Sequence, residues 1–487
     1  MIPAEAFVLP PASRGSLQQC IRQMVTEGVL AGRYRSGQKM PSSRGLAAHL
    51  AVSRITVTLA YAELVAADYL TAKGRSGYYI SDNAPLPFEM PQRAARAEAV
   101  DFARLSRERF SGRGEVERPA DWGSFEFPFI YGQADPTLFD HQNWRLCAVR
   151  ALGRRDFAAM TADYYDRDDP QLIDHLLRQI LPRRGIAARE DEVLLTLGAQ
   201  NALWITVTCL LGPGRRAAME NPGYPGLRAI LKVSGTEVRA VDVDAEGLPP
   251  DCLPTGVDVV FTTASHQCPT NATMPVERRL ALLQAAEKEG FIVVEDDYEF
   301  EMSFLKPASP ALKSLDYGGR VVYAGSFSKS VFPGMRLGYL VGPPGFIREA
   351  RALRLMSLRH PPGHIQRTLA YFLSLGHYDA LITRMKGAFK RRRQVMEEAI
   401  VANGLHVAGQ GGFGGSSFWM QTAADTERLA TLLRRDGVLI EPGRAFFDPG
   451  RPDHRHYRLG YSSIPVAKIA GGVARIAAAV EWIERQK

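Results

Sequence analysis

A single lysine, Lys329, follows an apolar run and enters a loop rich in serine and glycine. A lysine in this setting can form an imine with an aldehyde if packing lowers its pKa. Ser326, Ser328 and Arg336 lie close to it in the sequence, and hydroxyl and guanidinium groups are suited to binding a phosphate. The spacing therefore favours a site for a phosphorylated aldehyde, although an ordinary surface loop that contains a lysine stays an alternative at this point.

Residues 291–298 end a second apolar run in three acids and a tyrosine. Because side chains alternate between the two faces of a strand, Asp296 and Tyr298 should share one side, and Glu295 and Asp297 the other. A carboxylate that faces a pyridine nitrogen keeps it protonated, as an electron-sink cofactor requires. A solvated strand end would explain the same acids.

Three further segments supply groups of the same kind. Gly198, Ala199 and Gln200 open a helix after a strand, where free amides and the helix dipole attract a phosphate. Tyr224 lies in a Pro- and Gly-containing turn that suits stacking on a planar ring, and Arg458 lies in a late strand where it could clamp a carboxylate. Turn chemistry alone and an ordinary salt bridge are the alternatives.

Apolar runs alternate with helical patterns through the larger part of the chain. Continuous apolar segments of strand length begin near residues 192, 258, 291 and 321, and helix-like stretches cover 200–211, 276–289 and 345–357. Strands that are buried on both faces, with helices between them, are typical of a mostly parallel α/β sheet.

The first 80 residues have a different pattern. Residues 16–34 predict a helix whose apolar face consists of Leu17, Ile21, Met24, Val25 and Val29. A second helix is expected to begin at Pro41-Ser-Ser-Arg44, and a third to be capped by Ser53. Residues 69–80 predict two short strands around a Lys-Gly-Arg-Ser-Gly tip. Three helices and a hairpin indicate a winged helix-turn-helix.

Between these parts, residues 81–125 show no stable apolar face and contain Pro85, Pro87, Pro91 and Pro119. A compact domain seldom contains a structureless loop of that length, so the segment is predicted to be a linker.

Composition and charge limit the binding partners and the cellular compartment that the sequence favours. Residues 1–80 hold nine Lys and Arg against four Asp and Glu, so they carry +5 of the net charge of +8. A basic small domain on a nearly neutral large one suggests nucleic-acid binding, with ordinary surface scatter as the alternative. The five dispersed cysteines argue against disulfides or structural zinc and for a reducing cytoplasm, and no metal site is expected. The start lacks the features of a signal peptide, and no run is long enough for a membrane helix.

In this order, the motifs of residues 130–487 resemble the fold-type I aminotransferases, which bind pyridoxal 5′-phosphate (PLP). The resemblance implies a large α/β domain with a smaller α+β C-terminal domain. It assigns Lys329 to the Schiff base with PLP, Asp296 to the pyridine nitrogen, Tyr298 to the phenolic oxygen and Tyr224 to ring stacking. It further assigns the phosphate to Gly198, Ala199, Gln200, Ser326 and Arg336, and an amino-acid carboxylate to Arg458.

The N-terminal segment is similar to GntR-type winged helices, and the whole chain resembles the MocR/GabR transcriptional regulators. The implied organisation is a DNA-binding domain at 12–80, a linker at 81–125 and an aminotransferase class I/II-like effector domain at 126–487. The residues that the resemblance assigns to DNA are Ser42, Ser43, Arg44, Ser53, Arg54, Thr56, Arg75 and Gly77.

Two residues depart from the aminotransferase pattern. Cys268 stands where an asparagine usually contacts the cofactor ring, and many MocR relatives have a tyrosine there. Asn271 replaces the usual glycine after Pro-Thr. These departures leave the roles of that loop open.

The resemblance implies a DNA-binding regulator that senses an amine or amino acid, or PLP itself, and binds double-stranded operator DNA. An active aminotransferase with an accessory DNA-binding head is the alternative, and a transaminase half-reaction stays open in either case. Likeness to the family also implies a homodimer with head-to-tail packing. The effector, the operator and the direction of regulation do not follow from the sequence.

Overall fold

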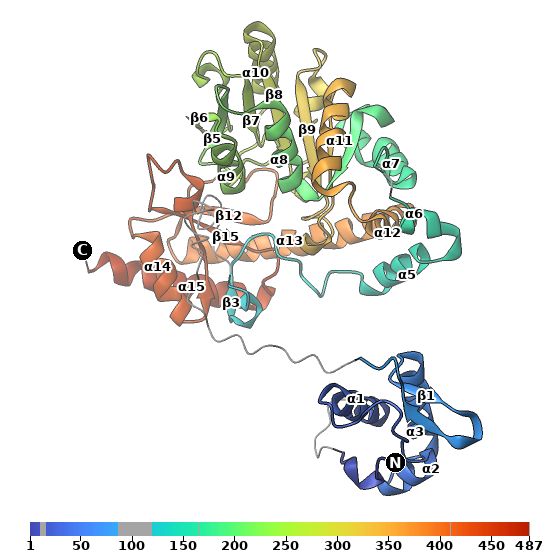
Figure 1. The fold of residues 1–487 in the computed structure, drawn as a ribbon. Helices are drawn as coiled ribbons and strands as arrows, with labels where there is room; N and C mark the ends of the chain where they lie inside the picture. Colours follow the sequence, from blue (N-terminus) through green and yellow to red (C-terminus); the bar gives the residue numbers. More distant parts are fainter. Residues whose placement is uncertain (10–15, 86–118, 164, 410, 487) are drawn as a thin grey trace, which may run out of the picture. The chain divides into compact units, whose positions relative to one another are not determined.

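The computed structural model describes residues 1–9, 16–85, 119–163, 165–409 and 411–486 (Figure 1). The chain divides into two compact units, Met1–Arg107 and Glu108–Lys487, and each is described by itself. The predicted linker at 81–125 contains that division, but its central part, 86–118, lies outside the described residues.

The first unit has the elements of a winged helix. Helices α1 (Leu17–Leu30), α2 (Ser43–His49) and α3 (Arg54–Ala66) precede strands β1 (Leu70–Ala72) and β2 (Tyr78–Ile80), which pair antiparallel. Each helix begins where a serine accepts a hydrogen bond from a backbone amide of the first turn, at Ser16, Ser42 and Ser53. The expected helices and hairpin are therefore present, and each helix start is a local effect of a capping serine.

The core of this unit differs in two respects from the sequence prediction. Ile21, Val25 and Val29 are buried as expected, but Leu17, the first residue of α1, is 45% exposed. Ile2 and Phe7 join the same core, upstream of the predicted boundary at residue 12. Residues before the first long helix thus help to complete the small unit.

The second unit is built on a seven-stranded sheet with the order β4-β10-β9-β8-β7-β5-β6. Only β10 runs against its neighbours, so the prediction of a mostly parallel sheet is confirmed. The strands are β4 (Val193–Thr196), β5 (Arg216–Asn221), β6 (Glu237–Asp242), β7 (Val259–Thr262), β8 (Ile292–Asp297), β9 (Val321–Ser326) and β10 (Gly338–Val341).

Helices cover both faces of this sheet (Figure 1). On one face Val294 packs with α8 (Gly198–Leu210), α9 (Pro225–Ser234) and α11 (Pro344–Leu358). On the other face the adjacent Val293 packs with α10 (Val276–Glu289). Because neighbouring residues of one strand point to opposite faces, both must be apolar, which is why these strands are continuous apolar runs.

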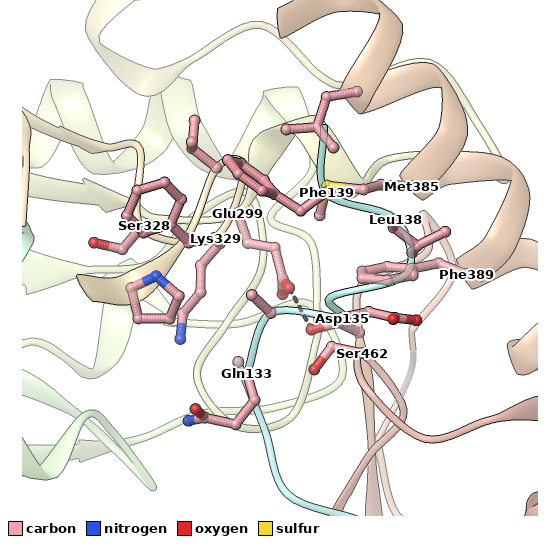
Figure 2. A pocket seen from close by; sticks show the side chains of 17 residues that line it. Gln133, Asp135, Leu138, Phe139, Glu299, Ser328, Lys329, Met385, Phe389 and Ser462 are labelled. Atoms are coloured by element: carbon pink, nitrogen blue, oxygen red, sulfur yellow. Dashed lines mark hydrogen bonds between the residues drawn. The ribbon is translucent and has the colours of Figure 1, made fainter. Parts of the chain in front are cut away.

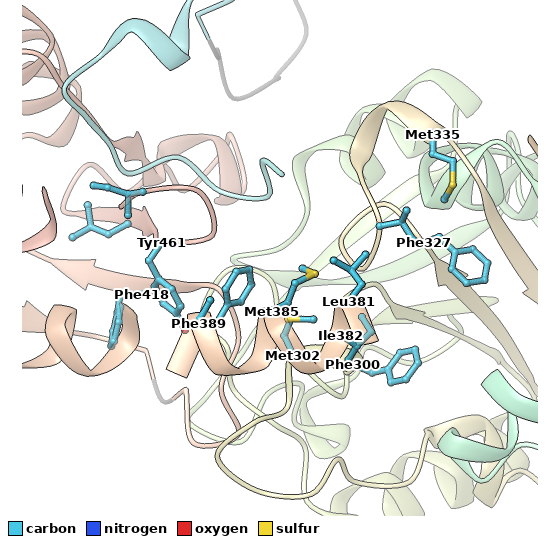
Figure 3. Close-up of a cluster of buried hydrophobic side chains, with 14 of the residues drawn as sticks. Phe300, Met302, Phe327, Met335, Leu381, Ile382, Met385, Phe389, Phe418 and Tyr461 are labelled. Atoms are coloured by element: carbon cyan, nitrogen blue, oxygen red, sulfur yellow. The ribbon is translucent and has the colours of Figure 1, made fainter. Parts of the chain in front are cut away.

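A third, larger core joins the sheet to the rest of this unit. The helices that contribute to it include α5 (His141–Ala151), α7 (Pro170–His175), α12 (Gly363–Ser374) and α13 (His377–Ala402), and the short helix α6 (Phe157–Thr161) lies against α12. In Figure 3, Leu381, Met385 and Phe389 of α13 lie in line between Phe300 and Phe327 at one end and Phe418 and Tyr461 at the other. The long helix α13 therefore ties the large sheet to the C-terminal domain.

The C-terminal domain is α+β, as expected. Strands β11 (His406–Val407), β12 (Ser417–Gln421), β15 (His456–Gly460) and β14 (Glu441–Pro442) form an antiparallel sheet packed with α14 (Thr426–Arg435) and α15 (Val466–Glu484). Strand β3 (Phe127–Pro128) pairs with β13 (Val438–Leu439) in this domain. The chain after β3 therefore runs beside β15, where Gly460 donates a backbone hydrogen bond to Phe129.

Within the described residues, no helix has both the length and the apolar character needed to cross a bilayer.

Candidate functional site

The loop after β9 brings Lys329 to the carboxyl edge of the sheet, where the loops after the other parallel strands also end. The hydroxyl of Ser326 accepts a hydrogen bond from the Ser328 amide at 3.1 Å, which fixes the turn before the lysine. The Lys329 Nζ lies 4.4 Å from the ring centre of Tyr131. The turn thus fixes where the lysine leaves the backbone, and its ammonium group lies over the Tyr131 ring.

The acids at the end of β8 alternate as predicted. Asp297 accepts hydrogen bonds from Arg184 at 2.7 Å and from the Tyr323 hydroxyl at 2.8 Å. Glu295 accepts from the amides of Leu312 and Lys313. These two carboxylates therefore belong to a buried network under the sheet edge, on the side away from Asp296.

Asp296 faces the cavity instead. Its Oδ1 is buried and has no hydrogen-bond partner among the described residues. Burial, together with the nearby carboxylates, raises the pKa of Asp296 to about 7. A buried carboxylate oxygen without a hydrogen-bond partner is costly, so this oxygen calls for a proton-bearing ligand.

The start of α8 forms a cradle. No side chain caps this helix, so the amides of its first turn are available to an anion. Gly198 has a φ of +77°, and a Cβ at this position would lie 3.3 Å from the guanidinium of Arg336. Arg336 also donates to the Leu197 carbonyl at 3.2 Å. Helix amides and a guanidinium thus converge where the sequence predicts a phosphate.

Tyr224 is positioned at the start of α9. Its hydroxyl donates to Gln200 Oε1 at 2.6 Å, and a Cβ at Gly226 would lie 2.6 Å from its ring. The glycine therefore leaves room for the aromatic ring, which lines the cavity.

One cavity of about 390 Å³ gathers nearly all the predicted residues. Its lining includes Ala199, Gln200, Tyr224, Asp296, Tyr298, Ser326, Lys329, Arg336 and Arg458. Gly198 lies directly behind Arg336. The donor set fits PLP, because the phosphate-type groups, the partnerless Asp296 carboxylate and the lysine are arranged around one space.

Arg458 reaches the same cavity from β15. Its Nε donates to Glu441 Oε2 at 2.7 Å, and its guanidinium carbon lies 4.1 Å from the ring centre of Tyr131 and 4.7 Å from that of Phe446. The arginine is therefore held by one carboxylate and two aromatic rings, an arrangement that orients a guanidinium toward an anion.

The loop after β7 explains one of the two departures. Asn271 has a φ of 60°, a conformation that asparagine tolerates better than most residues, and its side-chain amide donates to the Ser417 carbonyl at 2.7 Å. It therefore joins this loop to β12 of the C-terminal domain. Cys268 lines the cavity, and burial raises the pKa of its thiol to about 12, so the thiol is neutral.

Sequence reasoning missed Tyr131, Gly132, Phe446 and Glu299. Gly132 has a φ of +72°, and a Cβ at this position would overlap Lys329 Nζ. An aromatic run that ends in glycine, Phe129-Ile-Tyr-Gly132, was the available signal. It lies just after the predicted linker and has no local link to the lysine, so only the fold brings them together.

The candidate DNA surface lies on the first unit. Ser42 and Ser53 cap their helices, with hydrogen bonds from Gly45 and Thr56, while Arg44 and Arg54 are exposed at the helix starts. Ile55 and Leu59 of α3 are 71% and 48% exposed, whereas Val57, Tyr61 and Leu64 of the same helix are buried. Ser43 opens α2, and Gly77 of the wing has a φ of +102°. The side chain of Arg75 lies outside the described structure.

Two family models match the chain. Residues 139–472 match the aminotransferase class I and II family, and residues 17–80 match the gntR family of bacterial regulatory proteins. These ranges agree with the two units described above.

The chain is 63% identical to the HTH-type transcriptional regulator TauR of Rhodobacter capsulatus, over 98% of this chain and 99% of that protein. It is 28% identical to the probable rhizopine catabolism regulatory protein MocR of Rhizobium meliloti, over 94% and 92% of the two chains. Among solved structures, the α-aminoadipate aminotransferase LysN of Thermus thermophilus, complexed with N-(5′-phosphopyridoxyl)-L-leucine, shares the fold, with a TM-score of 0.71 and 24% identity over 80% of this chain and all of that one. The chain belongs to the MocR/GabR-type transcriptional regulators, in which a GntR-family winged helix precedes an aminotransferase class I/II domain.

Proposed function

We propose that this regulator binds PLP at Lys329 and changes its action on DNA when a small amine or amino acid binds beside the cofactor. The observation that carries the proposal is the single cavity that unites Lys329, the partnerless Asp296 and the Arg336 cradle. Catalytic turnover is not required, because binding of the amine is itself a signal.

The residues of the cavity have separate tasks. When bound, PLP supplies an aldehyde carbon that condenses with primary amines and a ring that withdraws electrons. Asp296 accepts a hydrogen bond from the protonated ring nitrogen, and this contact removes the cost of burying its charge. Gly198, Ala199, Gln200, Ser326 and Arg336 hold the phosphate. Tyr224 stacks on the ring, and Tyr298 contacts the phenolic oxygen.

Arg458 selects the effector. Because Glu441 and two aromatic rings hold its guanidinium, it can bind an anionic group of the amine without rearranging. Arg458→Ala should leave the cofactor spectrum intact and sharply reduce the spectral response to amino acids. If that response survives unchanged, the effector lacks an anionic group or PLP itself is sensed.

The winged helix supplies DNA binding. Arg54 at the start of α3 is exposed and can reach base edges, while Arg44, Ser42, Ser43 and the wing suit phosphate contacts. By likeness to the family we further propose a cytoplasmic homodimer, with each winged helix against the other chain's body.

Borohydride reduction tests the cofactor part. The purified protein should be yellow, and reduction followed by mass spectrometry should find the cofactor on the peptide that contains Lys329 and on no other lysine. A reduced protein with no adduct on that peptide would contradict the assignment. Salt-dependent binding to the gene's own upstream DNA tests the second part separately.

A further inference from the structure

A second, small cavity meets the first one at Lys329. It has a volume of about 30 Å³, enough for a water molecule or an ammonium group. Gly132, Ser328, Lys329 and Pro333 line both cavities. Figure 2 shows Lys329 and Glu299 side by side at this second cavity, on separate segments of the chain. The lysine side chain therefore borders both spaces.

Glu299 has an uncommitted oxygen at this place. The residue precedes the short helix η9 (Phe300–Met302) and is only 2% exposed. The Ser416 hydroxyl donates to Oε1. Oε2 is buried and accepts no hydrogen bond of good geometry among the described residues, although the neutral Tyr131 hydroxyl lies close enough to interact with the carboxylate. Burial raises the pKa of the carboxyl, and the Ser416 hydroxyl, the charge of Lys329, the Tyr131 hydroxyl and the charge of Arg458 oppose that rise. A buried carboxylate oxygen left in this way is costly and calls for a donor.

The other carboxylates that line the two cavities either form a salt bridge or are assigned to the cofactor. Asp135 is paired with Arg392 and accepts hydrogen bonds from Thr137. Asp296 faces the first cavity, where the proposed function assigns it to the cofactor ring. Among the carboxylates that line these cavities in the described structure, Glu299 is therefore the one with neither an arginine salt bridge nor a proposed contact with the cofactor ring.

We propose that Glu299 receives the ammonium group of Lys329 when an amine effector displaces this lysine from the cofactor. This inference rests on the proposed function. In the displacement, the effector nitrogen forms its bond to the aldehyde carbon and the bond to the lysine nitrogen breaks. The effector nitrogen gives up two hydrogens and the lysine nitrogen gains two. The lysine then takes a third proton from solvent, and no oxidant or reductant is involved.

The surroundings of Lys329 explain why a counterion is needed. Arg336 and Arg458 carry the same charge as a released lysine. Tyr131, Tyr298 and Cys268 stay neutral because burial raises the pKa of each, and the Tyr224 hydroxyl is bonded to Gln200. A buried ammonium without a counterion loses its proton, and the neutral amine would attack the cofactor again. Glu299 therefore stabilises the effector-bound state.

The first test uses the cofactor-free protein, so that it does not depend on PLP. Competitive labelling with acetic anhydride, followed by mass spectrometry across pH, measures the pKa of Lys329. Glu299→Gln should lower this pKa by about one unit or more and raise labelling at pH 7 about tenfold, because only the neutral amine reacts. Glu299→Asp keeps the charge and should restore most of the wild-type value.

Glu301→Gln is the matched control. Glu301 lies two residues further along, in η9. Like Glu299 it is a buried carboxylate that accepts one side-chain hydrogen bond, here from the Tyr378 hydroxyl, and has a second oxygen without one, but it lies outside the linings of both cavities. It should leave labelling of Lys329 unchanged. Equal pH midpoints for Lys329 in the wild type and Glu299→Gln, both folded by circular dichroism, would overturn the proposal.

The second test uses the cofactor-loaded protein and hydroxylamine as the displacing amine. Glu299→Gln should need about tenfold more hydroxylamine for half-displacement, followed by cofactor absorbance, because the released lysine lacks its counterion. If borohydride still links the cofactor to Lys329 in this variant but half-displacement is unchanged, the role of Glu299 is wrong and the proposed function stands. If borohydride links no cofactor to wild-type Lys329, the proposed function fails instead.

Discussion

The winged helix and the larger body use charge in opposite ways. In the described part of the winged helix, no lysine or arginine side chain is buried, and Ser81 is the single polar residue that is buried there. The body buries Arg184, Arg279 and Arg354 completely, each near a carboxylate. Exposed charges act over a distance and are screened by salt, whereas buried pairs fix neighbouring groups in place. The first arrangement suits a polyanion such as DNA, and the second suits a small ligand.

The largest effect should come from the body alone. Lys329→Ala should abolish the covalent link to the cofactor and the response to any amine, because the alanine has no amino group. Non-covalent PLP should still bind, more weakly, through the phosphate cradle and Asp296. Affinity for upstream DNA, measured by fluorescence anisotropy, should stay near the wild-type value. A matching loss of DNA affinity would show that the two regions are not separable in this way.

Two neighbouring acids of β8 should respond in opposite directions in the cofactor-free protein. Asp297→Asn leaves the buried Arg184 without its counterion and should cost ~3–5 kcal/mol of unfolding free energy. Asp296→Asn should stabilise the protein at pH 8, because it removes an unpaired buried charge. The folded-state pKa of Asp296 is raised to about 7, so its favourable contribution is present below about pH 4 and is lost as the pH rises to about 7.

Urea unfolding at pH 5 and pH 8 measures both variants. Asp296→Asn should flatten the loss of stability between these pH values, and Asp297→Asn should not. Destabilisation of similar size by both substitutions at pH 8 would mean that the two side chains share one environment.

A smaller effect is expected for the exposed charges of the winged helix, measured as a loss of DNA affinity. Arg54→Ala should cost ~1–3 kcal/mol of binding to upstream DNA if the guanidinium contacts a base edge. Arg22→Ala is the control, because Glu63 holds that guanidinium at 3.1 Å. Titrations at several salt concentrations should show a strong salt dependence for DNA and a weak one for PLP. Equal losses for Arg54 and Arg22 would argue against a role of α3 in base contacts.

The smallest effect should be local to α3. Ser53→Ala removes the cap that accepts from the Thr56 amide at 3.1 Å, and should cost about 1 kcal/mol. Hydrogen exchange at the Thr56 amide should become about fivefold faster, while amides of the body stay unchanged. If exchange at the Thr56 amide is unaltered, the Ser53 hydroxyl does not stabilise the start of α3, and its role would be limited to contact with DNA.

Features that depend on a few adjacent residues could be predicted from the sequence. The separation of Asp296 from Asp297 follows from the two-residue period of a strand, and the start of α3 follows from the capping hydroxyl of Ser53. The apolar run before Lys329 likewise indicated a buried strand that ends in a loop. The error at Leu17 has a related cause, since periodicity gives the face of a helix but not how far its partners extend.

The sequence by itself therefore determined the two units, the mostly parallel sheet and most of the polar residues that line the cavity, because each rests on local spacing and recognisable motifs. Only the tertiary structure decided which groups complete that site. Gly132 packs against Lys329, Glu441 holds Arg458, and the Glu299 carboxylate accepts a hydrogen bond from Ser416, 117 residues away. Such contacts join segments that have no shared pattern, since the relative position of distant loops is set by how helices and sheets pack.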